Sequence, residues 1–129
     1  YIQTEQFNWQ IFLLAIPVGT LSCAILAVNN LRDLPQDDLV GKRTMAVRIG
    51  EKNTRVFFML LLVTAQVTAL AAASISSLAL ITLICSPITY SVVRQVLNGA
   101  VGAELIDVLS KTAKLQLLMA SLLAAALAI

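Results

Sequence analysis

The sequence predicts an all-helical membrane protein, a polytopic bundle of about four transmembrane helices. Apolar residues make up 59% of its 129 positions, and the mean hydropathy is +0.88. Two stretches, 6–31 and 56–93, contain no charged residue. Soluble domains are much less apolar than this, and an uncharged apolar stretch of about 20 residues is long enough to cross a bilayer.

The first span is expected at 7–30, within the first uncharged stretch. Trp9 stands near its start, where aromatic side chains commonly lie at the membrane interface. Pro17 and Gly19 predict a kink, which membrane helices tolerate because neighbouring helices satisfy the freed backbone groups.

The second uncharged stretch is long enough for two spans, expected at 54–73 and 77–97. The serine-rich sequence 74–77 is the expected turn between them. Pro87 predicts a kink in the second of the two, and Asn98-Gly99 is a typical helix end.

A second cytoplasmic loop is expected at 98–112, followed by a last span at 113–129. Charged residues between 104 and 114 alternate with apolar ones, which predicts a short amphipathic helix lying at the interface. Lys111 and Lys114 would extend their charged ends to the interface from the base of the last span.

The basic residues predict the orientation. All nine fall in the two connections that a four-span topology places on one side, at positions 32, 42, 43, 48, 52, 55, 94, 111 and 114. The positive-inside rule makes that side cytoplasmic. We therefore expect an integral, multi-pass protein of a prokaryotic plasma (inner) membrane, with the aspartate-rich loop 31–52 in the cytoplasm.

Composition also excludes several classes of function. The sequence has no histidine, which rules out bis-His haem ligation, histidine acid-base catalysis and Ser-His hydrolysis within this chain. A net charge of +2 is too small to predict binding to nucleic acid. Cys23 and Cys85 stand alone in apolar runs and are expected to be small buried residues. The chain starts at Tyr1 without a signal peptide, and we interpret it as a segment of a longer protein.

The segment 29–50, NNLRDLPQDDLVGKRTMAVRIG, concentrates charge beside an apolar span. In a continuous helix, Asn30, Asp33 and Asp37 would share one face. Pro35 disfavours helical geometry at the residue before it, so we expect the helix to end or bend near Asp33 and a short helix to begin at Pro35. Gly41 is the expected turn after it, and Gly50 the expected stop before the next helix.

This segment has the chemistry of a site for a metal and a phosphorylated ligand. Asp33 and Asp37 are close enough to share a hard cation, which prefers oxygen ligands. Lys42 and Arg43 follow, where they can hold the outer oxygens of a diphosphate. The alternative is an ordinary solvated loop. Asn29 and Asn30 argue against it, because their amides lie in a partly apolar setting where they need hydrogen-bond partners.

Other known phosphate-binding and metal-binding motifs do not match this sequence. A D-D-x-x-D motif starting at Asp37 would need an acid at position 41, which is Gly41. The D-G-x-x-A-R sequence of CDP-alcohol transferases is absent, and Gly41-Lys42-Arg43 lacks the remaining residues of a P-loop.

The pattern N-N-x-R-D-x-x-x-D-x-x-x-G-K-R-T-x-A-V-R-x-G resembles the second aspartate-rich motif of the UbiA-type intramembrane prenyltransferases. Its paired Asn, Gly-Lys-Arg-Thr and Ala-Val-Arg are most similar to the branch that prenylates 1,4-dihydroxy-2-naphthoate in menaquinone or phylloquinone synthesis. The run 112–118, TAKLQLL, is similar to the start of the last helix in that branch.

The resemblance implies a fold of nine spans, of which this chain matches spans six to nine. Two aspartate-rich motifs would face each other across a cavity near the cytoplasmic surface. The first motif has no counterpart here, so the chain alone is expected to be inactive.

The resemblance also implies a mechanism, a cofactor and partners. Mg²⁺ would join the aspartates to the diphosphate of a polyprenyl or phytyl donor, and the allylic group would pass to the aromatic acceptor. The fixed cations would stabilise the departing diphosphate. The implied metal ligands are Asp33 and Asp37, the implied catalytic cations are Lys42 and Arg43, and the implied substrate-binding residues are Asn29, Asn30, Arg32, Lys42 and Arg43.

Two alternatives stay open at this point. One is a related enzyme acting on 4-hydroxybenzoate, homogentisate or a tetrapyrrole, and the other is a cation transporter or channel segment. Outside the motif, Gln66 is expected to pack between helices and Arg94 to be a flanking charge, whereas Gln116 fits packing and cavity lining equally well.

Overall fold

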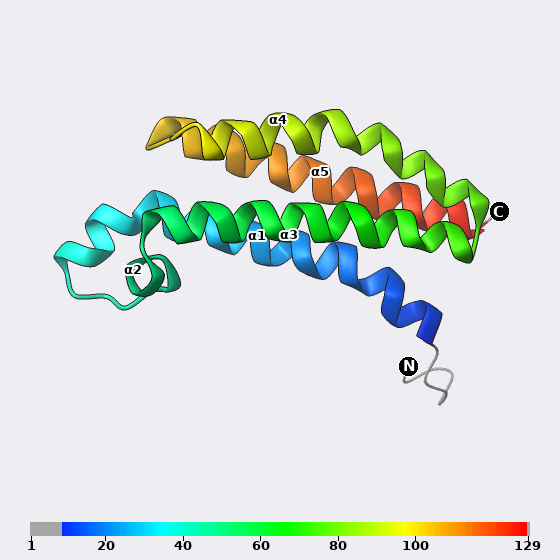
Figure 1. Ribbon diagram of the computed structural model, residues 1–129, viewed down its shortest axis with the longest axis horizontal. Helices are drawn as coiled ribbons and strands as arrows, with labels where there is room; N and C mark the ends of the chain where they lie inside the picture. The colour runs from blue at the N-terminus through cyan, green and yellow to red at the C-terminus, as the bar shows by residue number, and fades with distance from the viewer. Residues whose placement is uncertain (1–8, 129) are drawn as a thin grey trace.

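The computed structural model describes residues 9–128, and every regular element in that range is helical. Four long rods follow one another along the chain (Figure 1), which confirms the predicted fold class. They are α1 (Trp9–Leu39), α3 (Glu51–Ala71) with the 3₁₀ turn η1 (Ala72–Ser74), the 3₁₀ helix η2 (Ser77–Cys85) with α4 (Ser86–Leu97), and α5 (Ala103–Ala128). Each rod is long and apolar enough to cross a membrane. Positions 7–8 and 129 of the expected spans lie outside the described residues.

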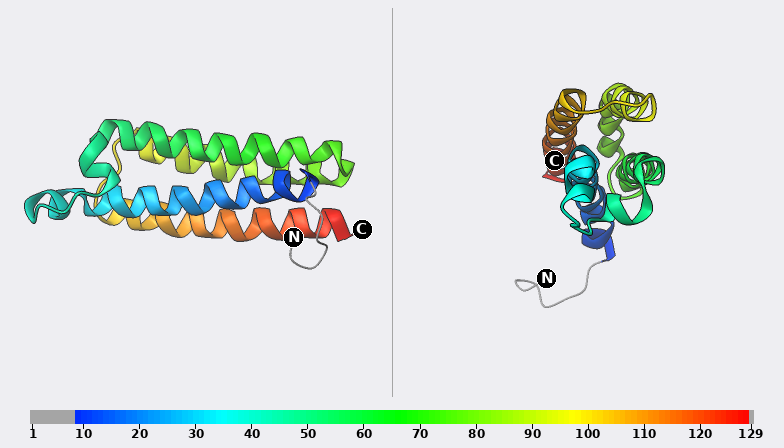
Figure 2. Two further views of the ribbon diagram at one scale, coloured as in Figure 1. Left: turned by 90° about the horizontal axis from the view of Figure 1, so that it is seen from below. Right: turned by 90° about the vertical axis from the view of Figure 1, so that its left-hand side faces the viewer.

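The rods form an up-down-up-down bundle. Helices α3 and α5 each pack against both α1 and α4, so α1 and α4 lie on a diagonal of the bundle (Figure 2, right). The connection from α1 to α3, which contains the short α2 (Met45–Ile49), lies at the same end as the connection from α4 to α5 (Figure 1). The topology therefore places these two connections, with the basic residues in and near them, on one side, as the charge pattern predicts.

Helix α1 is longer than the sequence predicts. The expected end or bend near Asp33, with a new helix starting at Pro35, is wrong, because α1 continues to Leu39. Pro35 removes only one backbone donor, and buried residues on both sides of it, Leu31 and Asp37, keep the helix packed. The aspartates of the motif therefore stand on a helix rather than in a loop.

Two glycines with positive φ shape the connection to α3. Gly41, at φ +74°, makes the predicted turn, and the Lys42 N–H donates to the Asp37 carbonyl at 2.9 Å. Gly50, at φ +87°, ends α2 and precedes α3, as predicted. Such backbone angles favour glycine because it has no Cβ. The chain thus reverses tightly and returns α2 to the end of α1.

The turn between the second and third rods lies within the predicted serine cluster. The Ser76 hydroxyl donates to the Ala126 carbonyl at 3.0 Å and ties this turn to the end of α5. Gln66 has the predicted interhelical role, because its amide donates to the Thr82 carbonyl at 3.2 Å and accepts from the Thr89 hydroxyl at 3.4 Å. Pro87 cannot donate to the Leu83 carbonyl, which accepts instead from the Ser86 N–H across the junction of η2 and α4.

The expected boundary between a cytoplasmic loop at 98–112 and a span at 113–129 is also different in the structure. A single helix, α5, runs through both, and only residues 98–102 connect it to α4. Nothing in its sequence breaks the helix, and Leu105, Val108, Thr112 and Leu115 form one buried stripe at helical spacing. The amphipathic segment is therefore the first part of the last rod.

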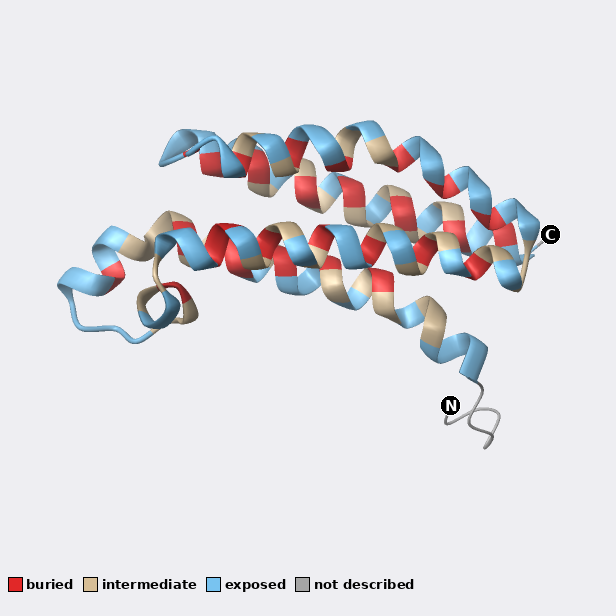
Figure 3. Ribbon diagram, viewed as in Figure 1, coloured by how far each residue is buried: buried red, intermediate tan, exposed pale blue. Residues whose placement is uncertain are grey.

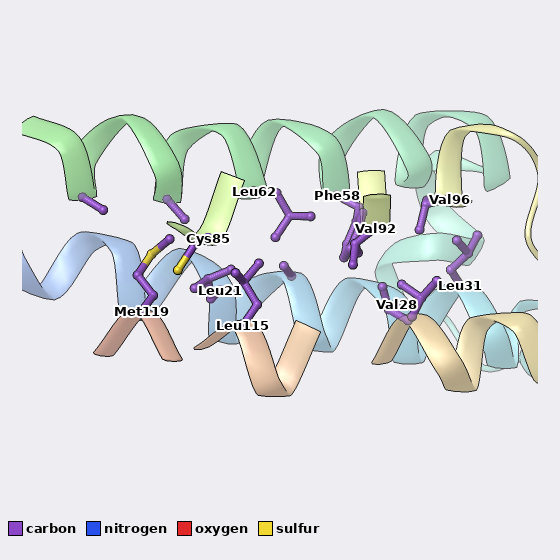
Figure 4. Packing of buried hydrophobic residues seen from close by; sticks show 14 of the residues in the cluster. Leu21, Val28, Leu31, Phe58, Leu62, Cys85, Val92, Val96, Leu115 and Met119 are labelled. Atoms are coloured by element: carbon purple, nitrogen blue, oxygen red, sulfur yellow. The ribbon is translucent and has the colours of Figure 1, made fainter. Parts of the chain in front are cut away.

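The core is made of large apolar side chains placed between small ones. Phe58, Leu62, Leu21 and Leu115 are fully buried where the four rods meet (Figure 4). Small residues let membrane helices approach closely, and fully buried alanines occur at positions 24, 65, 69, 72 and 79. Exposed positions run along the outside of the bundle (Figure 3). Many of them are large apolar residues, such as Leu26, Leu60 and Leu117, as expected for surfaces that meet lipid or further helices.

The topology predicts which positions are reachable from each side of the membrane. In the whole parent protein, freed of its own reactive cysteines, single variants Lys42→Cys, Asn98→Cys and Ser77→Cys should be treated with an impermeant maleimide in right-side-out vesicles. Ser77→Cys should label in intact vesicles, and the other two only after permeabilisation. Labelling of Lys42→Cys and Asn98→Cys from opposite sides would contradict the bundle.

Candidate active site

Asn29 and Asp33 lie on a face of α1 that remains partly exposed, and Asp37 continues this face to the point where α2 covers it. Residues on the opposite face, including Val28 and Leu31, are buried against α3 and α5. Asn29 and Asp33 are four residues apart, as are Asp33 and Asp37, so they lie above one another on the helix. Asn29 and Asp33 are partly exposed. This polar face thus points toward space that other parts of a longer protein can occupy.

Asp33 is paired with its neighbour Arg32. The Arg32 Nε donates to Asp33 Oδ1 at 2.9 Å, and its Nη2 donates to Oδ2 at 3.2 Å. About half of the Asp33 side chain, 47%, is exposed. The guanidinium therefore holds the carboxylate in place and balances its charge, while leaving it accessible to a ligand.

Asp37 is in a different environment, because α2 packs against this end of α1. Its side chain is only 10% exposed, and Lys42 Nζ lies 3.9 Å from its Oδ1. A buried carboxylate is costly unless a positive charge or hydrogen bonds compensate it. The turn at Gly41 supplies that charge by bringing Lys42 back over the helix end.

Three cations surround a cavity of about 410 Å³ beside this turn. Lys42, Arg43 and Arg48 line it together with Asp38, Gly41 and Val47. Thr44 caps α2 by accepting from the Val47 N–H at 3.5 Å, and this single helical turn returns Arg48 toward Arg43. An excess of positive charge in a hollow of this size can hold the oxygens of a diphosphate.

Arg48 was not among the residues predicted for the site. The sequence carried a signal for it, since Arg48 belongs to the Ala-Val-Arg of the motif. Its position in the cavity depends on α2, a helix of five residues whose existence the sequence did not reveal.

Arg55 is a second cation whose role was not predicted. It is buried, its Nη2 lies 2.6 Å from Glu51 Oε1, and its Nη1 donates to the Val96 carbonyl at 2.7 Å. Arg55 and Arg32 also line the same small cavity of about 70 Å³ under α1. Arg55 therefore joins the start of α3 to the end of α4, directly beneath the part of α1 that carries the aspartates.

The structure also places Gln116 and Arg94, two residues outside the motif. The Gln116 amide donates to the Ser22 hydroxyl at 2.6 Å and to the Val18 carbonyl at 3.2 Å, so it packs α5 against α1. Arg94 is exposed at the end of α4 and does not line the cationic cavity.

The residues present fit half of a magnesium site. No group of three or more Asp, Glu, Cys or His side chains within residues 9–128 is arranged to hold a metal ion. Mg²⁺ is commonly bound through only one or two carboxylates, completed by substrate phosphates and water. Asp33 and Asp37, one helical turn apart, can supply those carboxylates, and Lys42, which contacts Asp37, also lines the cationic cavity.

Comparison with known proteins identifies relatives, two of which match nearly the whole chain. A 1,4-dihydroxy-2-naphthoate octaprenyltransferase of Mycobacterium tuberculosis (strain ATCC 25618 / H37Rv) is 35% identical over 128 residues, which cover 99% of this chain and 44% of the relative. A protein of the same name from Mycobacterium leprae (strain TN) is 33% identical over 127 residues, covering 98% of this chain and 43% of the relative. A third, from Haemophilus influenzae (strain ATCC 51907 / DSM 11121 / KW20 / Rd), is 45% identical over 71 residues, covering 55% of this chain and 23% of the relative.

The chain spans less than half the length of these relatives. No solved structure matches it significantly. The model of the UbiA prenyltransferase family matches residues 1–104, which include the aspartate-rich motif and the first three rods. The chain is therefore an integral, multi-pass membrane protein that belongs to the UbiA prenyltransferase family.

Proposed function

We propose that the chain is the C-terminal part of an enzyme that transfers a polyprenyl or phytyl group from its diphosphate to 1,4-dihydroxy-2-naphthoate, in menaquinone or phylloquinone synthesis. The observation that carries the proposal is the position of Asp33 and Asp37 on one face of α1, next to a cavity lined by three cations. The names of the relatives favour this acceptor. The family match favours an enzyme over a transporter.

Asp33 and Asp37 are proposed to hold Mg²⁺ together with acids from the part of the protein that this chain does not include. When bound, Mg²⁺ neutralises the diphosphate and makes it a better leaving group. Arg32 already contacts Asp33, so it is close enough to move to the diphosphate when the carboxylate turns to the metal. Asn29 and Asn30 lie one turn before Asp33 and are proposed to hydrogen-bond to substrate.

Lys42, Arg43 and Arg48 are proposed to stabilise the departing diphosphate. Breaking the allylic C–O bond leaves the electron pair on the leaving group, which gains negative charge. Cations already placed around the leaving group stabilise that charge. The allylic carbon then forms a bond to the electron-rich ring, and the ring of a naphthoate acceptor loses its carboxylate as CO₂.

The apolar part of α1 is proposed to line the path of the prenyl tail. Gly19 and Leu26 lie on the same side of the helix as Asp33 and are exposed, with Leu26 60% exposed. A prenyl diphosphate needs such a surface, because its apolar tail can lie along the helix while its diphosphate reaches the charged site. It also requires the reaction to occur at a membrane, which we propose is a prokaryotic plasma membrane with the motif on its cytoplasmic side.

Removing either motif carboxylate should abolish metal-dependent transfer. We expect Asp33→Asn and Asp37→Asn in the whole parent protein to lower kcat/KM by about 100-fold or more, because each removes charge that acts in the transition state. Asp107→Asn, which removes an exposed carboxylate of α5, is the matched control and should keep its activity. Membranes supplied with prenyl diphosphate and either Mg²⁺ or a chelator provide the assay.

The same assay distinguishes the acceptors. 1,4-Dihydroxy-2-naphthoate, 4-hydroxybenzoate and homogentisate should be supplied in parallel, and product should form from the naphthoate. Product from another acceptor alone would assign a different branch of the family. Full activity of both aspartate variants would overturn the proposed site.

Arg48 should contribute to binding of the diphosphate. We expect Arg48→Gln to raise the KM for prenyl diphosphate by about 10-fold or more, as expected for the loss of one hydrogen bond between charged groups, and to leave the KM for the aromatic acceptor unchanged. Lys52→Gln removes an exposed charge outside the cavity and serves as the control. An equal change in both KM values would instead indicate a general distortion of the cytoplasmic end.

A further inference from the structure

A second charged groove lies on the outside of the bundle, away from the motif. It has a volume of about 350 Å³ and is lined by Pro87, Ile88 and Ser91 of α4 and by Lys111 and Lys114 of α5. The α4 side of this groove is diagonal to α1, the helix that carries the aspartates. The groove and the cationic cavity have no lining residue in common.

The two lysines differ in how their charge is compensated. Lys111 Nζ lies 2.7 Å from Asp107 Oδ2 and donates to Gln95 Oε1 at 3.2 Å, so it is held in place. Lys114 forms no ion pair with any residue between 9 and 128. Arg94, one turn beyond Ser91 on α4, forms none there either, so the groove keeps positive charge after Asp107 has been counted.

Lys111 and Lys114 stand where the charged first part of α5 gives way to its uncharged apolar part. Lys114 is 11 residues beyond the start of α5, which is about 16 Å along the helix, and the next residue, Leu115, is fully buried in the core. A cation at this level is unfavourable unless water or an anion compensates it. A lysine on a membrane helix can extend its ammonium group to the interface, where lipid phosphates lie.

The groove continues into an apolar surface. Beyond Pro87, toward the opposite end of the bundle, Leu83 and Ile84 are 51% and 58% exposed. Positive charge at the membrane boundary followed by apolar side chains is complementary to an amphiphile with an anionic head and an acyl tail.

We propose that this groove binds an anionic phospholipid of the surrounding bilayer. Lys111 and Lys114 hold the phosphate, the Ser91 hydroxyl donates to it, and the acyl chain lies along Pro87 and Ile88. This proposal does not depend on the acceptor or on the reaction at the motif.

The test uses the purified parent protein in a neutral detergent, with phosphatidylglycerol as the anionic probe and phosphatidylcholine as the zwitterionic one. Phosphatidylglycerol should raise the thermal unfolding temperature, and phosphatidylcholine should not. The double variant Lys111→Gln/Lys114→Gln should lose more than half of that shift. Lys52→Gln, which removes a charge at the same end of the bundle but outside the groove, should retain it.

Photo-crosslinking keeps the test decisive if the double variant is unstable. With benzoylphenylalanine in place of Ser91, we expect crosslinks to phosphatidylglycerol in preference to phosphatidylcholine. Equal crosslinking of both lipids, an unchanged shift in the double variant, or crosslinks to another segment of the parent protein would overturn the proposal. A shift caused by prenyl diphosphate should persist in the double variant, and its loss would make the groove a substrate site instead.

Discussion

The candidate site depends on the continuity of α1 from the apolar core to Leu39. The buried stripe of this helix packs against α3 and α5 as far as Leu31, and the helix then continues through Pro35 without ending. Because the rotation per residue is fixed in a helix, anchoring Leu21 and Val28 in the core also fixes the direction of Asp33. The packing of the bundle therefore positions the aspartates, although none of its core residues touches them through a polar contact.

The end of the bundle that carries the motif is stabilised by cations that bond to groups outside their own helical turn. Arg55 connects α3 to the Val96 carbonyl of α4, and Lys42 pairs with Asp37 across the turn at Gly41. Removing one member of a buried charged pair is usually much more destabilising than removing an exposed one. Cations at this end thus have two functions, because some hold the elements together while others, such as Arg43 and Arg48, face the cavity.

Much of the architecture could be predicted from the sequence, because apolar length and the placement of charge determine membrane spans. The serine turn, the interhelical role of Gln66 and the turns at Gly41 and Gly50 followed from local chemistry. The positions of two helix ends could not be predicted in this way. Pro35 and the charged segment 104–114 both suggested breaks, but packing of Leu31 in one case and the buried stripe from Leu105 onward in the other kept the helices continuous.

The site itself could be predicted only in part. The sequence pattern identified the aspartates and Lys42-Arg43, whose functions remain predictions. The position of Arg48 depends on how α2 returns to α1, and that of Arg55 on how α4 packs against α3. Such contacts join residues as far apart as Arg55 and Val96, and no local pattern encodes them. In the proposed metal site the two carboxylates need further ligands, because the described residues contain no group of three or more that could hold a metal ion.

Metal binding by the whole parent protein tests the central claim most directly. Mn²⁺ can replace Mg²⁺ and its binding can be followed by electron paramagnetic resonance, in the presence of a non-reactive prenyl thiodiphosphate. We expect the wild type and Asp107→Asn to bind Mn²⁺ with the analogue, and Asp33→Asn/Asp37→Asn to bind it at least about 10-fold more weakly. Equal Mn²⁺ affinity in all three proteins would contradict the claim that this face of α1 is half of a metal and diphosphate site.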